Sequence, residues 1–291
     1  MTTDGSVGGA RHLPVAGQGP LTRRCADLSP EGGGEDRADT AGSFGVTIRI
    51  RLDIALEQRR LVQSRARGRD AVLRGTVRVN GVPVAKPGML VGETDKIEIS
   101  DPAGRYVSRA ALKLIAGLDA GGIEVAGKTC LDLGASTGGF TQVLVERGAA
   151  KVYAVDVGHG QLHANVAALP NVIAMEGTNV RELTRELVAE PVDLLVCDIS
   201  FVSVTKVLAA PLGLCRAGAD AVILIKPQFE VGRERIGKGG IVADEAAIAE
   251  AIAAVVGFVT AEGWRHRASV PSPIAGGDGN KETVALFSRI G

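Results

Sequence analysis

The chain has 291 residues, with 33 basic and 33 acidic side chains, and 45% of its residues are apolar. This length and apolar content exclude a wholly disordered chain and suffice for one large core with a smaller module beside it. Aromatic residues make up only 3% while glycine occurs 39 times, a composition that favours an α/β sheet packed by small aliphatic side chains over an aromatic-rich barrel or sandwich.

The neutral total hides three segments of different charge. Residues 1–45 are rich in glycine, carry 4 basic and 6 acidic side chains, and show no apolar periodicity, so we expect a flexible extension. Residues 46–105 carry 12 basic against 7 acidic side chains, and residues 106–291 carry 17 against 20. The sequence therefore predicts this extension, a small basic domain with its linker over 46–105, and a larger domain over 106–291.

The cysteines, the histidines and the chain start bear on location and on metals. The cysteines stand far apart without a CxxC pair, and the histidines lack metal-site spacing, so we expect no metal site and a reducing compartment. The first residues lack the basic and apolar regions of a signal peptide. Residues 246–261 are apolar but contain Glu250 and are too short to span a bilayer. We expect a cytoplasmic protein in which 246–261 is a core-facing helix.

The basic segment predicts two short helices followed by a small β-ribbon. Apolar residues recur at helical spacing over 52–56, and Ser64 is a candidate cap for a second helix. After that helix the apolar period changes to two over 77–79, and Asn80-Gly81 predicts a tight hairpin turn before Val82 and Val84. A further strand is expected over 96–100. The apolar face expected for the second helix consists of Ala66, Ala71, Val72 and Leu73.

Arginine is concentrated on this small domain. Between residues 58 and 78, seven arginines stand against one acid, Asp70. A solvated helical face usually mixes both signs, so this stretch favours a polyanionic partner. The plain alternative is an exposed basic helix without a ligand.

Four short motifs in this segment resemble an S4-type RNA-binding domain. They are Arg51-Leu52-Asp53, Ser64-Arg65, GTVRVNG over 75–81 and Lys86-Pro87-Gly88. The resemblance implies that basic side chains lie along folded RNA, where they anchor and orient it without reading its sequence. The candidate RNA contacts are Arg49, Arg51, Arg65 and Lys86.

The larger domain opens with a strand, a glycine turn and a helix. A short apolar strand over 128–132 leads into Gly134-Ala-Ser-Thr-Gly138-Gly139 and then into an apolar-periodic helix. Glycines at such a turn let backbone amides approach a ligand. The next strand, 151–155, is followed by Asp156, 22 positions beyond Gly134, where a carboxylate can accept hydrogen bonds from ribose hydroxyls. An adenine nucleoside is expected, and both NAD and S-adenosylmethionine (SAM) contain one.

Three details favour SAM over NAD. Asp132 lies inside the strand end, where it can meet the ammonium of a methionine group, and Asn179 follows the third strand, where it can read an adenine edge. The glycine spacing is GxxxGG, unlike the GxGxxG that brings a pyrophosphate onto helix amides. An NAD-linked oxidoreductase remains the alternative. The candidate SAM-binding residues are Asp132, Gly134, Ser136, Gly138, Phe140, Asp156, Val157 and Asn179.

Further strands are expected over 192–197, 221–225, 267–270 and 283–287, with helices between most of them. This alternation predicts a doubly wound, Rossmann-like parallel sheet that binds its ligand at the carboxyl ends of its strands. The last strand follows its predecessor closely and is expected to be antiparallel, as in class I methyltransferases.

Two charged residues end apolar strands. Asp198 follows the fourth strand and Lys226 follows the fifth, and a lysine at such a position is costly to desolvate unless it is paired. The structural alternative to a functional role is a buried ion pair. Together with Lys113 and Glu282, these residues resemble the K-D-K-E tetrad of FtsJ-type ribose 2′-O-methyltransferases.

Residues 43–291 resemble the TlyA family, in older usage haemolysin A, which joins an S4 domain to an FtsJ-like methyltransferase. The matching blocks are YVSRAALKL (106–114), DLGASTGGFT (132–141), DVGHGQL (156–162), DISFVS (198–203), KPQFE (226–230) and GKGG (237–240). The resemblance implies a monomeric, SAM-dependent, metal-free enzyme that methylates cytidine 2′-hydroxyls of 16S or 23S ribosomal RNA, on RNA or ribosomal subunits.

Methyl transfer to a ribose hydroxyl needs alignment and a proton acceptor, and Lys226 is the candidate base, with the other tetrad members as further candidate catalytic residues. Two alternatives are a non-catalytic RNA-binding or ribosome-assembly factor and a pore-former, although the sequence shows no segment suited to a pore.

Overall fold

The structure is a computed structural model that describes residues 48–291, so the extension predicted over 1–45 lies outside the described residues. The N-terminal elements are β1 (Ile50–Arg51), α1 (Leu52–Gln58), α2 (Arg65–Leu73), β2 (Val77–Val79), β3 (Val82–Pro83), β4 (Leu90–Val91) and β5 (Ile97–Ile99).

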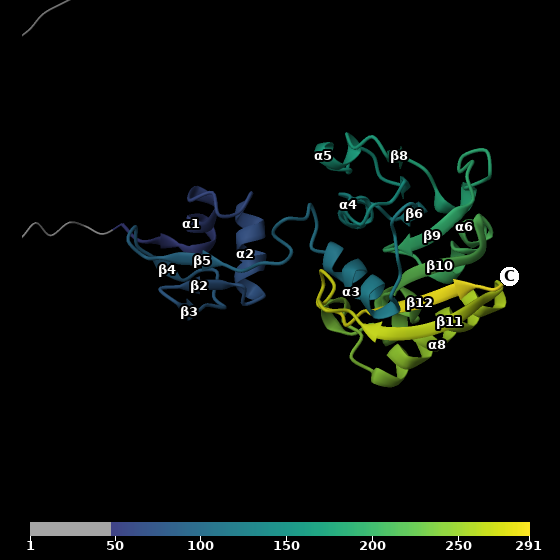
Figure 1. Cartoon of the computed structure of the whole chain (residues 1–291). Helices are drawn as coiled ribbons and strands as arrows, with labels where there is room; N and C mark the ends of the chain where they lie inside the picture. Colours follow the sequence, from purple (N-terminus) through teal and green to yellow (C-terminus); the bar gives the residue numbers. More distant parts are fainter. Residues whose placement is uncertain (1–47) are drawn as a thin grey trace, which may run out of the picture. The chain divides into compact units, whose positions relative to one another are not determined.

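The elements of the larger domain are α3 (Ala111–Gly121), β6 (Thr129–Leu133), α4 (Gly139–Glu146), β7 (Lys151–Asp156), α5 (Ala164–Ala167), β8 (Val172–Glu176), β9 (Val192–Cys197), α6 (Ala209–Gly213), β10 (Cys215–Ile225), α7 (Pro227–Glu230), α8 (Glu245–Ala261), β11 (Trp264–Pro271) and β12 (Thr283–Arg289) (Figure 1). Short 3-10 turns lie at η1 (Val180–Glu182), η2 (Val204–Lys206), η3 (Arg233–Arg235) and η4 (Lys238–Gly240).

The two N-terminal helices pack together at a glycine. A Cβ atom on Gly68 would lie 3.2 Å from the carbonyl oxygen of Asp53 and 3.3 Å from Cβ of Leu56, so only a glycine permits this approach without a shift. This contact turns Gly68, and not Ala66, toward α1. The predicted apolar face of α2 is therefore wrong at Ala66 and Leu73, which are exposed, and right at its other two members, which are buried.

The cap and the turn of the N-terminal domain are confirmed. The backbone N–H of Arg67 donates to Oγ of Ser64 at 3.3 Å, which satisfies one free donor at the start of α2. Asn80 and Gly81 both have positive φ, 51° and 80°, as a two-residue turn between twisted strands requires. The resulting hairpin joins β2 to β3, and β5 pairs on the other side of β2.

The larger domain contains a seven-stranded sheet in the order β11-β12-β10-β9-β6-β7-β8. The strands from β10 to β8 are parallel, and β12 is antiparallel to both of its neighbours. This confirms the doubly wound prediction and its antiparallel last strand. Helices α3 and α4 cover one face of the sheet and α8 covers the other (Figure 1), and each face has its own apolar cluster.

The strands expected over 221–225, 267–270 and 283–287 are longer in the structure, as β10, β11 and β12, and β10 differs most. The apolar pattern indicated 221–225, but β10 begins at Cys215 and reaches Ile225. Its first part is mostly exposed, includes Gly218 at a φ of +76°, and breaks register with β9 between Cys215 and Asp220. Such an irregular, exposed stretch has no alternating apolar pattern, so periodicity detects only the buried half.

The predicted core-facing helix is confirmed as α8. The backbone N–H of Ala246 donates to Oδ1 of Asp244 at 2.9 Å, which caps the helix. Its buried residues recur every fourth position, at Ala247, Ala251, Val255 and Val259. Within residues 48–291, no helix combines the length and apolar character needed to cross a membrane.

Candidate active site

The sheet brings three of the four predicted catalytic residues to one edge. Asp198 directly follows β9, Lys226 directly follows β10, and Glu282 directly precedes β12. Because β10 and β12 are antiparallel neighbours with Ile225 opposite Thr283, the next positions in register are Lys226 and Glu282. The carboxyl ends of parallel strands are where ligands of such sheets bind.

Helix α3 supplies the fourth residue, Lys113. A Cβ atom on Gly117 would lie 2.8 Å from Cγ1 of Val284 and 2.9 Å from Cγ1 of Val222. Since Gly117 leaves this space free, α3 lies close against β12 and β10. Lys113, one helical turn earlier, thereby reaches Glu282.

The four side chains form two ion pairs, of which Lys113–Glu282 is buried and Lys226–Asp198 is partly buried. Nζ of Lys113 donates to Oε2 of Glu282, and their side chains are 8% and 2% exposed. Nζ of Lys226 lies 2.6 Å from Oδ1 of Asp198 and also donates to the carbonyl oxygen of Asp198 at 3.0 Å and to Oγ of Ser200 at 2.8 Å. A buried ion pair is poor evidence of stabilisation, because desolvation offsets much of the attraction. Two such pairs at a ligand-binding edge favour a chemical role.

A cleft of about 380 Å³ adjoins the Lys226–Asp198 pair. This volume falls within the range of small-molecule sites, roughly 300–1,000 Å³. Asp198, Ser200 and Phe201 line one side of it. Five of the predicted SAM-binding residues line the cleft as well: Gly134, Ser136, Asp156, Val157 and Asn179.

The glycine turn is held in place by Asp156. The backbone N–H groups of Ser136 and Gly158 donate to its two carboxylate oxygens at 2.8 Å each. Each carboxylate oxygen can still accept another hydrogen bond. Gly134 has a φ of +81°, and a Cβ there would lie 3.1 Å from the carbonyl oxygen of Asp198, so glycine is needed for both conformation and space. Asp156 thus organises the turn in addition to facing the cleft.

Asp132 lies beneath the cleft and does not line it. Its side chain is fully buried, and its Oδ2 accepts a hydrogen bond from Oγ1 of Thr141 at 2.6 Å. Oδ1 has no hydrogen-bond partner among the residues that the structure describes. Burial raises the pKa of Asp132 to about 7, the hydrogen bond from Thr141 opposes this shift, and the negative charges of Asp198 and Asp156 add to it. An unpaired buried carboxylate oxygen fits a site that receives a cationic donor.

Gly138 and Phe140 also lie outside the cleft lining. Gly138 has a φ of +94°, and a Cβ there would lie 2.8 Å from Cδ1 of Leu162. Phe140 is 3% exposed and belongs to the apolar cluster under α3 and α4. The structure therefore places both as supports of the turn from below. Asn179, which lines the cleft, accepts a hydrogen bond from the backbone N–H of Arg181 at 3.1 Å, and its NH₂ group is not used in that bond.

Phe201 is a candidate functional residue that the sequence reading missed. Its side chain is 91% exposed, it lines the cleft, and its φ is +71°. A positive φ is rare for a bulky residue and marks local strain. Its ring centroid lies 5.5 Å from that of Phe229. Since Phe201 stands in the apolar run Ile-Ser-Phe-Val, sequence pattern alone indicates burial and gives no signal of this exposure.

Three arginines of the N-terminal domain are held by hydrogen bonds within the chain. Arg59, Arg67 and Arg74 are half-buried and bind within the chain. Arg59 donates to the carbonyl oxygens of Asp95 and Gly92 at 2.6 Å each, Arg67 donates to those of Ala103 and Tyr106, and Arg74 binds both oxygens of Asp101 at 2.6 and 2.7 Å. The basic face is therefore narrower than seven arginines suggest.

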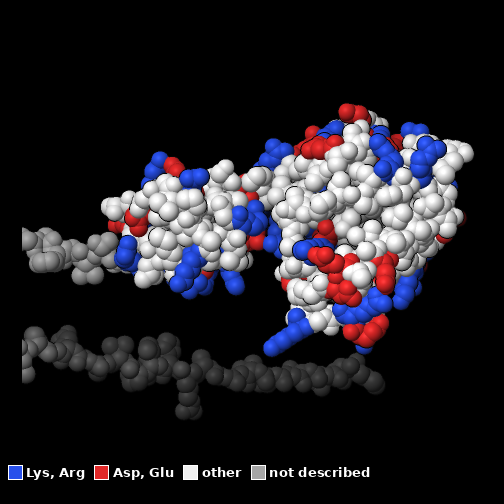
Figure 2. Space-filling model, turned by 90° about the horizontal axis from the view of Figure 1, so that it is seen from below, with Lys and Arg blue, Asp and Glu red and all other residues white. Residues whose placement is uncertain are grey.

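All four predicted RNA contacts, Arg49, Arg51, Arg65 and Lys86, are exposed. Lys and Arg side chains also stand at several separate places on the surface of this domain (Figure 2). Exposure leaves these four side chains accessible to an anionic partner.

Comparisons with known proteins match both domains. A family model described as FtsJ-like methyltransferase matches residues 106–289, and the S4 domain model matches residues 50–97. The protein named 16S/23S rRNA (cytidine-2'-O)-methyltransferase TlyA from Mycobacterium tuberculosis (strain CDC 1551 / Oshkosh) is 44% identical over 235 residues, which cover 80% of this chain and 88% of that protein.

Hemolysin A from Brachyspira hyodysenteriae is 37% identical over 239 residues, or 82% of this chain and 99% of the relative. A solved structure described as a hemolysin from Streptococcus thermophilus superposes with a TM-score of 0.65 at 33% identity, covering 84% of this chain and 90% of that one. Because these matches span both domains, the chain belongs to the TlyA (hemolysin A) family, which joins an S4 domain to an FtsJ-like methyltransferase.

Proposed function

We propose that this chain transfers the methyl group of SAM to the 2′-hydroxyl of cytidine in ribosomal RNA, as a monomer in the cytoplasm. The observation that carries the proposal is the partly buried Lys226–Asp198 pair at the edge of a cleft of nucleoside size. The name of the mycobacterial relative supports the substrate. Ribosomal RNA of the small subunit, the large subunit, or both is the target.

Lys226 acts as the proton acceptor. Bound SAM supplies an activated methyl group, so the protein has to align the ribose hydroxyl and remove its proton. The hydroxyl oxygen gains the methyl carbon as the bond from that carbon to the sulfur of SAM breaks, and the hydroxyl proton passes to Nζ of Lys226, which has to give up one proton of its ammonium form before it can accept. Asp198 and Ser200 hold Nζ of Lys226 in position through contacts of 2.6 and 2.8 Å. Glu282 of the Lys113–Glu282 pair lies next to Lys226 in the register of β10 and β12. This pair forms another wall of the reaction site.

The cleft residues supply the SAM contacts. Asp156 accepts hydrogen bonds from the ribose hydroxyls with the lone pairs that the turn leaves free. Asn179 reads the adenine edge with its NH₂ group, and Val157, 73% exposed, covers the base. Asp132 meets the methionine ammonium from below, which satisfies its unpaired oxygen. No metal ligand is needed for this reaction.

Asp132 predicts a pH dependence of SAM binding. A cationic ligand binds the carboxylate form, and the pKa of this group lies near 7, so SAM affinity should rise as the proton is lost. We expect the Kd of SAM to fall about tenfold between about pH 6 and pH 8, as measured by calorimetry. Asp132→Asn should bind weakly with a flat profile. A wild-type Kd that is constant over this range contradicts the assignment.

In the protein without SAM, loss of the Asp132 proton lowers the stability of the fold, whereas it raises the affinity for SAM. The folded-state pKa of Asp132 is raised above the ordinary value of 3.8, so the folded state binds more protons than the unfolded state between these two values. The contribution of Asp132 to stability is therefore fully present below about pH 4 and is lost as the pH rises toward 7. The difference in melting temperature between wild type and Asp132→Asn, followed over this range without SAM, measures that contribution.

Phe201 predicts an effect confined to RNA. An exposed ring beside the reaction site is a stacking platform for the target base, and such stacking contributes about 1–3 kcal/mol. Phe201→Ala should lower kcat/KM for ribosomal RNA by roughly 10- to 100-fold, while Phe201→Trp retains most activity. SAM affinity should stay unchanged, as should the activity of Leu187→Ala, another exposed apolar residue. Equal losses in SAM binding and in kcat/KM would assign Phe201 to the cofactor instead.

The proposal is tested by transfer of labelled methyl groups. Purified full-length chain, labelled SAM and ribosomal subunits from a strain lacking the gene should give label in ribosomal RNA, and NAD should not bind in equilibrium dialysis. Tight RNA binding without label would support the assembly-factor alternative, and binding of NAD without SAM would support the oxidoreductase.

A further inference from the structure

One acidic side chain of the N-terminal domain is buried among its arginines. Asp53, in the first turn of α1, has a side chain that is 1% exposed. Its Oδ1 accepts from Nε of Arg51 and its Oδ2 accepts from Nη2 of Arg51, each at 3.0 Å, which is a bidentate pair. Oδ2 also accepts from Nε of Arg65 at 3.0 Å. Two arginines that are 14 positions apart in sequence therefore share one carboxylate.

Both arginines remain accessible despite this contact. The side chain of Arg51 is 46% exposed and that of Arg65 is 55% exposed. Of the five N–H groups on a guanidinium, Arg51 uses two and Arg65 uses one on the carboxylate. Among residues 48–291 no further acceptor binds the remaining N–H groups, which are left for an outside acceptor. Since Nη2 of Arg51 and Nε of Arg65 each lie 3.0 Å from the same oxygen, the two guanidinium groups are neighbours.

The loop after β3 holds Arg51 from another side. A Cβ atom on Gly88 would lie 3.1 Å from Nη1 of Arg51, so the guanidinium packs directly against this glycine. The loop itself is fixed to α1, because the backbone N–H of Asp53 donates to the carbonyl oxygen of Pro87 at 3.0 Å and that of Leu52 donates to Met89 at 2.7 Å. Arg51 is thus fixed by a carboxylate and by backbone.

We propose that Asp53 is a positioning residue for RNA, which holds Arg51 and Arg65 side by side as one clamp for backbone phosphate oxygens. This inference rests on the proposed function, in which the S4 domain docks ribosomal RNA. Free arginine side chains lose rotamer entropy when they bind, and Asp53 removes much of that loss before RNA arrives. One negative charge against two positive charges leaves the clamp with a net positive charge toward the solvent.

The charge state of the clamp is constant at physiological pH. The hydrogen bond from Arg51 lowers the pKa of Asp53 to about 2, burial opposes this, and Arg65 lowers it further. Asp53 is therefore ionised throughout the range in which ribosomes are stable, and we expect no pH switch in this contact.

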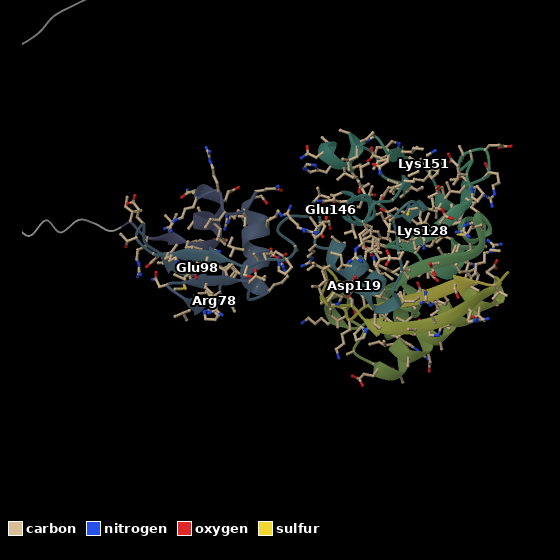
Figure 3. The ribbon with its side chains drawn as sticks, in the orientation of Figure 1. Arg78, Glu98, Asp119, Lys128, Glu146 and Lys151 are labelled. Atoms are coloured by element: carbon tan, nitrogen blue, oxygen red, sulfur yellow. The ribbon has the colours of Figure 1, made fainter. Side chains whose placement is uncertain are left out.

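The positioning role and simple electrostatics predict opposite changes in RNA affinity for Asp53→Asn. Asp53→Asn removes a negative charge, so charge alone predicts tighter RNA binding. Positioning predicts that the full-length chain binds ribosomal subunits about tenfold more weakly, with a salt slope reduced by roughly one. Glu98→Gln is the matched control, because it makes the same change in charge on β5, where Glu98 lies opposite Arg78 on β2 (Figure 3). It should leave affinity unchanged within about twofold.

Two further variants extend the test of the positioning role, and Gly88→Ala does so even if Asp53→Asn does not fold. Gly88→Ala brings a methyl group against the far end of Arg51 without altering the carboxylate, and should weaken subunit binding about threefold at unchanged melting temperature. Arg51→Ala should cost less affinity in the Asp53→Asn background than in the wild type, because both changes act on one clamp. SAM affinity should not change in any of these variants.

The outcomes separate this inference from the proposed function. Asp53→Asn that binds subunits as tightly as wild type, or additive losses in the double variant, would overturn the positioning role while methyl transfer stands. If Asp53→Asn does not fold, unchanged binding by Gly88→Ala overturns it. Failure of the wild-type chain to bind subunits at all would instead refute the docking role of the S4 domain.

Discussion

Lys226→Ala should abolish methyl transfer to ribosomal RNA while SAM still binds within about threefold of wild type. A positioned general base contributes about 10²- to 10⁴-fold to rate, and the alanine side chain has no proton acceptor in place of the amine. Nζ of Lys226 is held by Asp198 and Ser200, whereas the proposed SAM contacts, Asp156 and Asn179, lie at the end of β7 and after β8. The measurement is the single-turnover rate with labelled SAM, together with the Kd of SAM by calorimetry.

Lys226→Arg separates catalysis from a purely structural ion pair. Arginine keeps the positive charge beside Asp198 but is protonated at all working pH values, so it cannot accept a proton. We expect Lys226→Arg to fold and bind SAM but to remain inactive. Lys206→Ala, an exposed lysine on η2, is the control and should be fully active. Substantial activity in Lys226→Arg would reduce the pair to a structural role.

Glu282→Gln should be both unstable and inactive. Lys113 and Glu282 are almost fully buried, and removing one partner of such a pair leaves an uncompensated charge that costs about 3–5 kcal/mol. The free energy of unfolding, measured in urea, should fall by this amount. The same variant also loses the charged contact between Lys113 and Glu282, whose place in the β10–β12 register is next to Lys226.

Replacing both Lys113 and Glu282 distinguishes the loss of stability from the loss of activity. A Lys113→Met and Glu282→Leu double variant has no buried charge, and such replacements are often neutral or stabilising. We expect it to recover most of the stability of the wild type and to remain at least about 100-fold less active. A stable double variant with wild-type activity would exclude this pair from the chemistry.

Strands bounded by polar residues could be predicted closely from the sequence. The strand expected over 192–197 is β9, Val192–Cys197, because the apolar run 194–197 ends abruptly at Asp198. Strand ends then locate the charged residues, since parallel strands share one carboxyl edge. The meeting of Asp198, Lys226 and Glu282 thus follows from sequence pattern and topology together.

Contacts between distant segments could not be predicted. Nothing in the local pattern shows that Arg74 binds Asp101 or that Asp53 binds Arg65, because the arginine run contains a single acid and its partners lie elsewhere in the chain. The exposure of an apolar residue such as Phe201 could not be predicted either. Apolar periodicity predicts which residues are buried, and functional surfaces often expose such residues.

The glycine motif predicts a single set of SAM-binding residues. In the structure, some of them line the cleft and others do not. Gly134 and Ser136 line the cleft, whereas Gly138 and Phe140 pack beneath the turn. Sequence spacing identifies the turn, but the side on which each residue faces depends on how α4 and α5 pack against it.

Mass spectrometry of nucleosides from ribosomal RNA tests the central claim most directly. Subunits from a strain lacking the gene are incubated with SAM and the purified chain, and their RNA is digested to nucleosides. We expect 2′-O-methylcytidine with the wild-type chain and none with Lys226→Ala, although both bind SAM and subunits. A methyl group on the cytosine base, or 2′-O-methylcytidine at wild-type level with Lys226→Ala, would contradict the central claim.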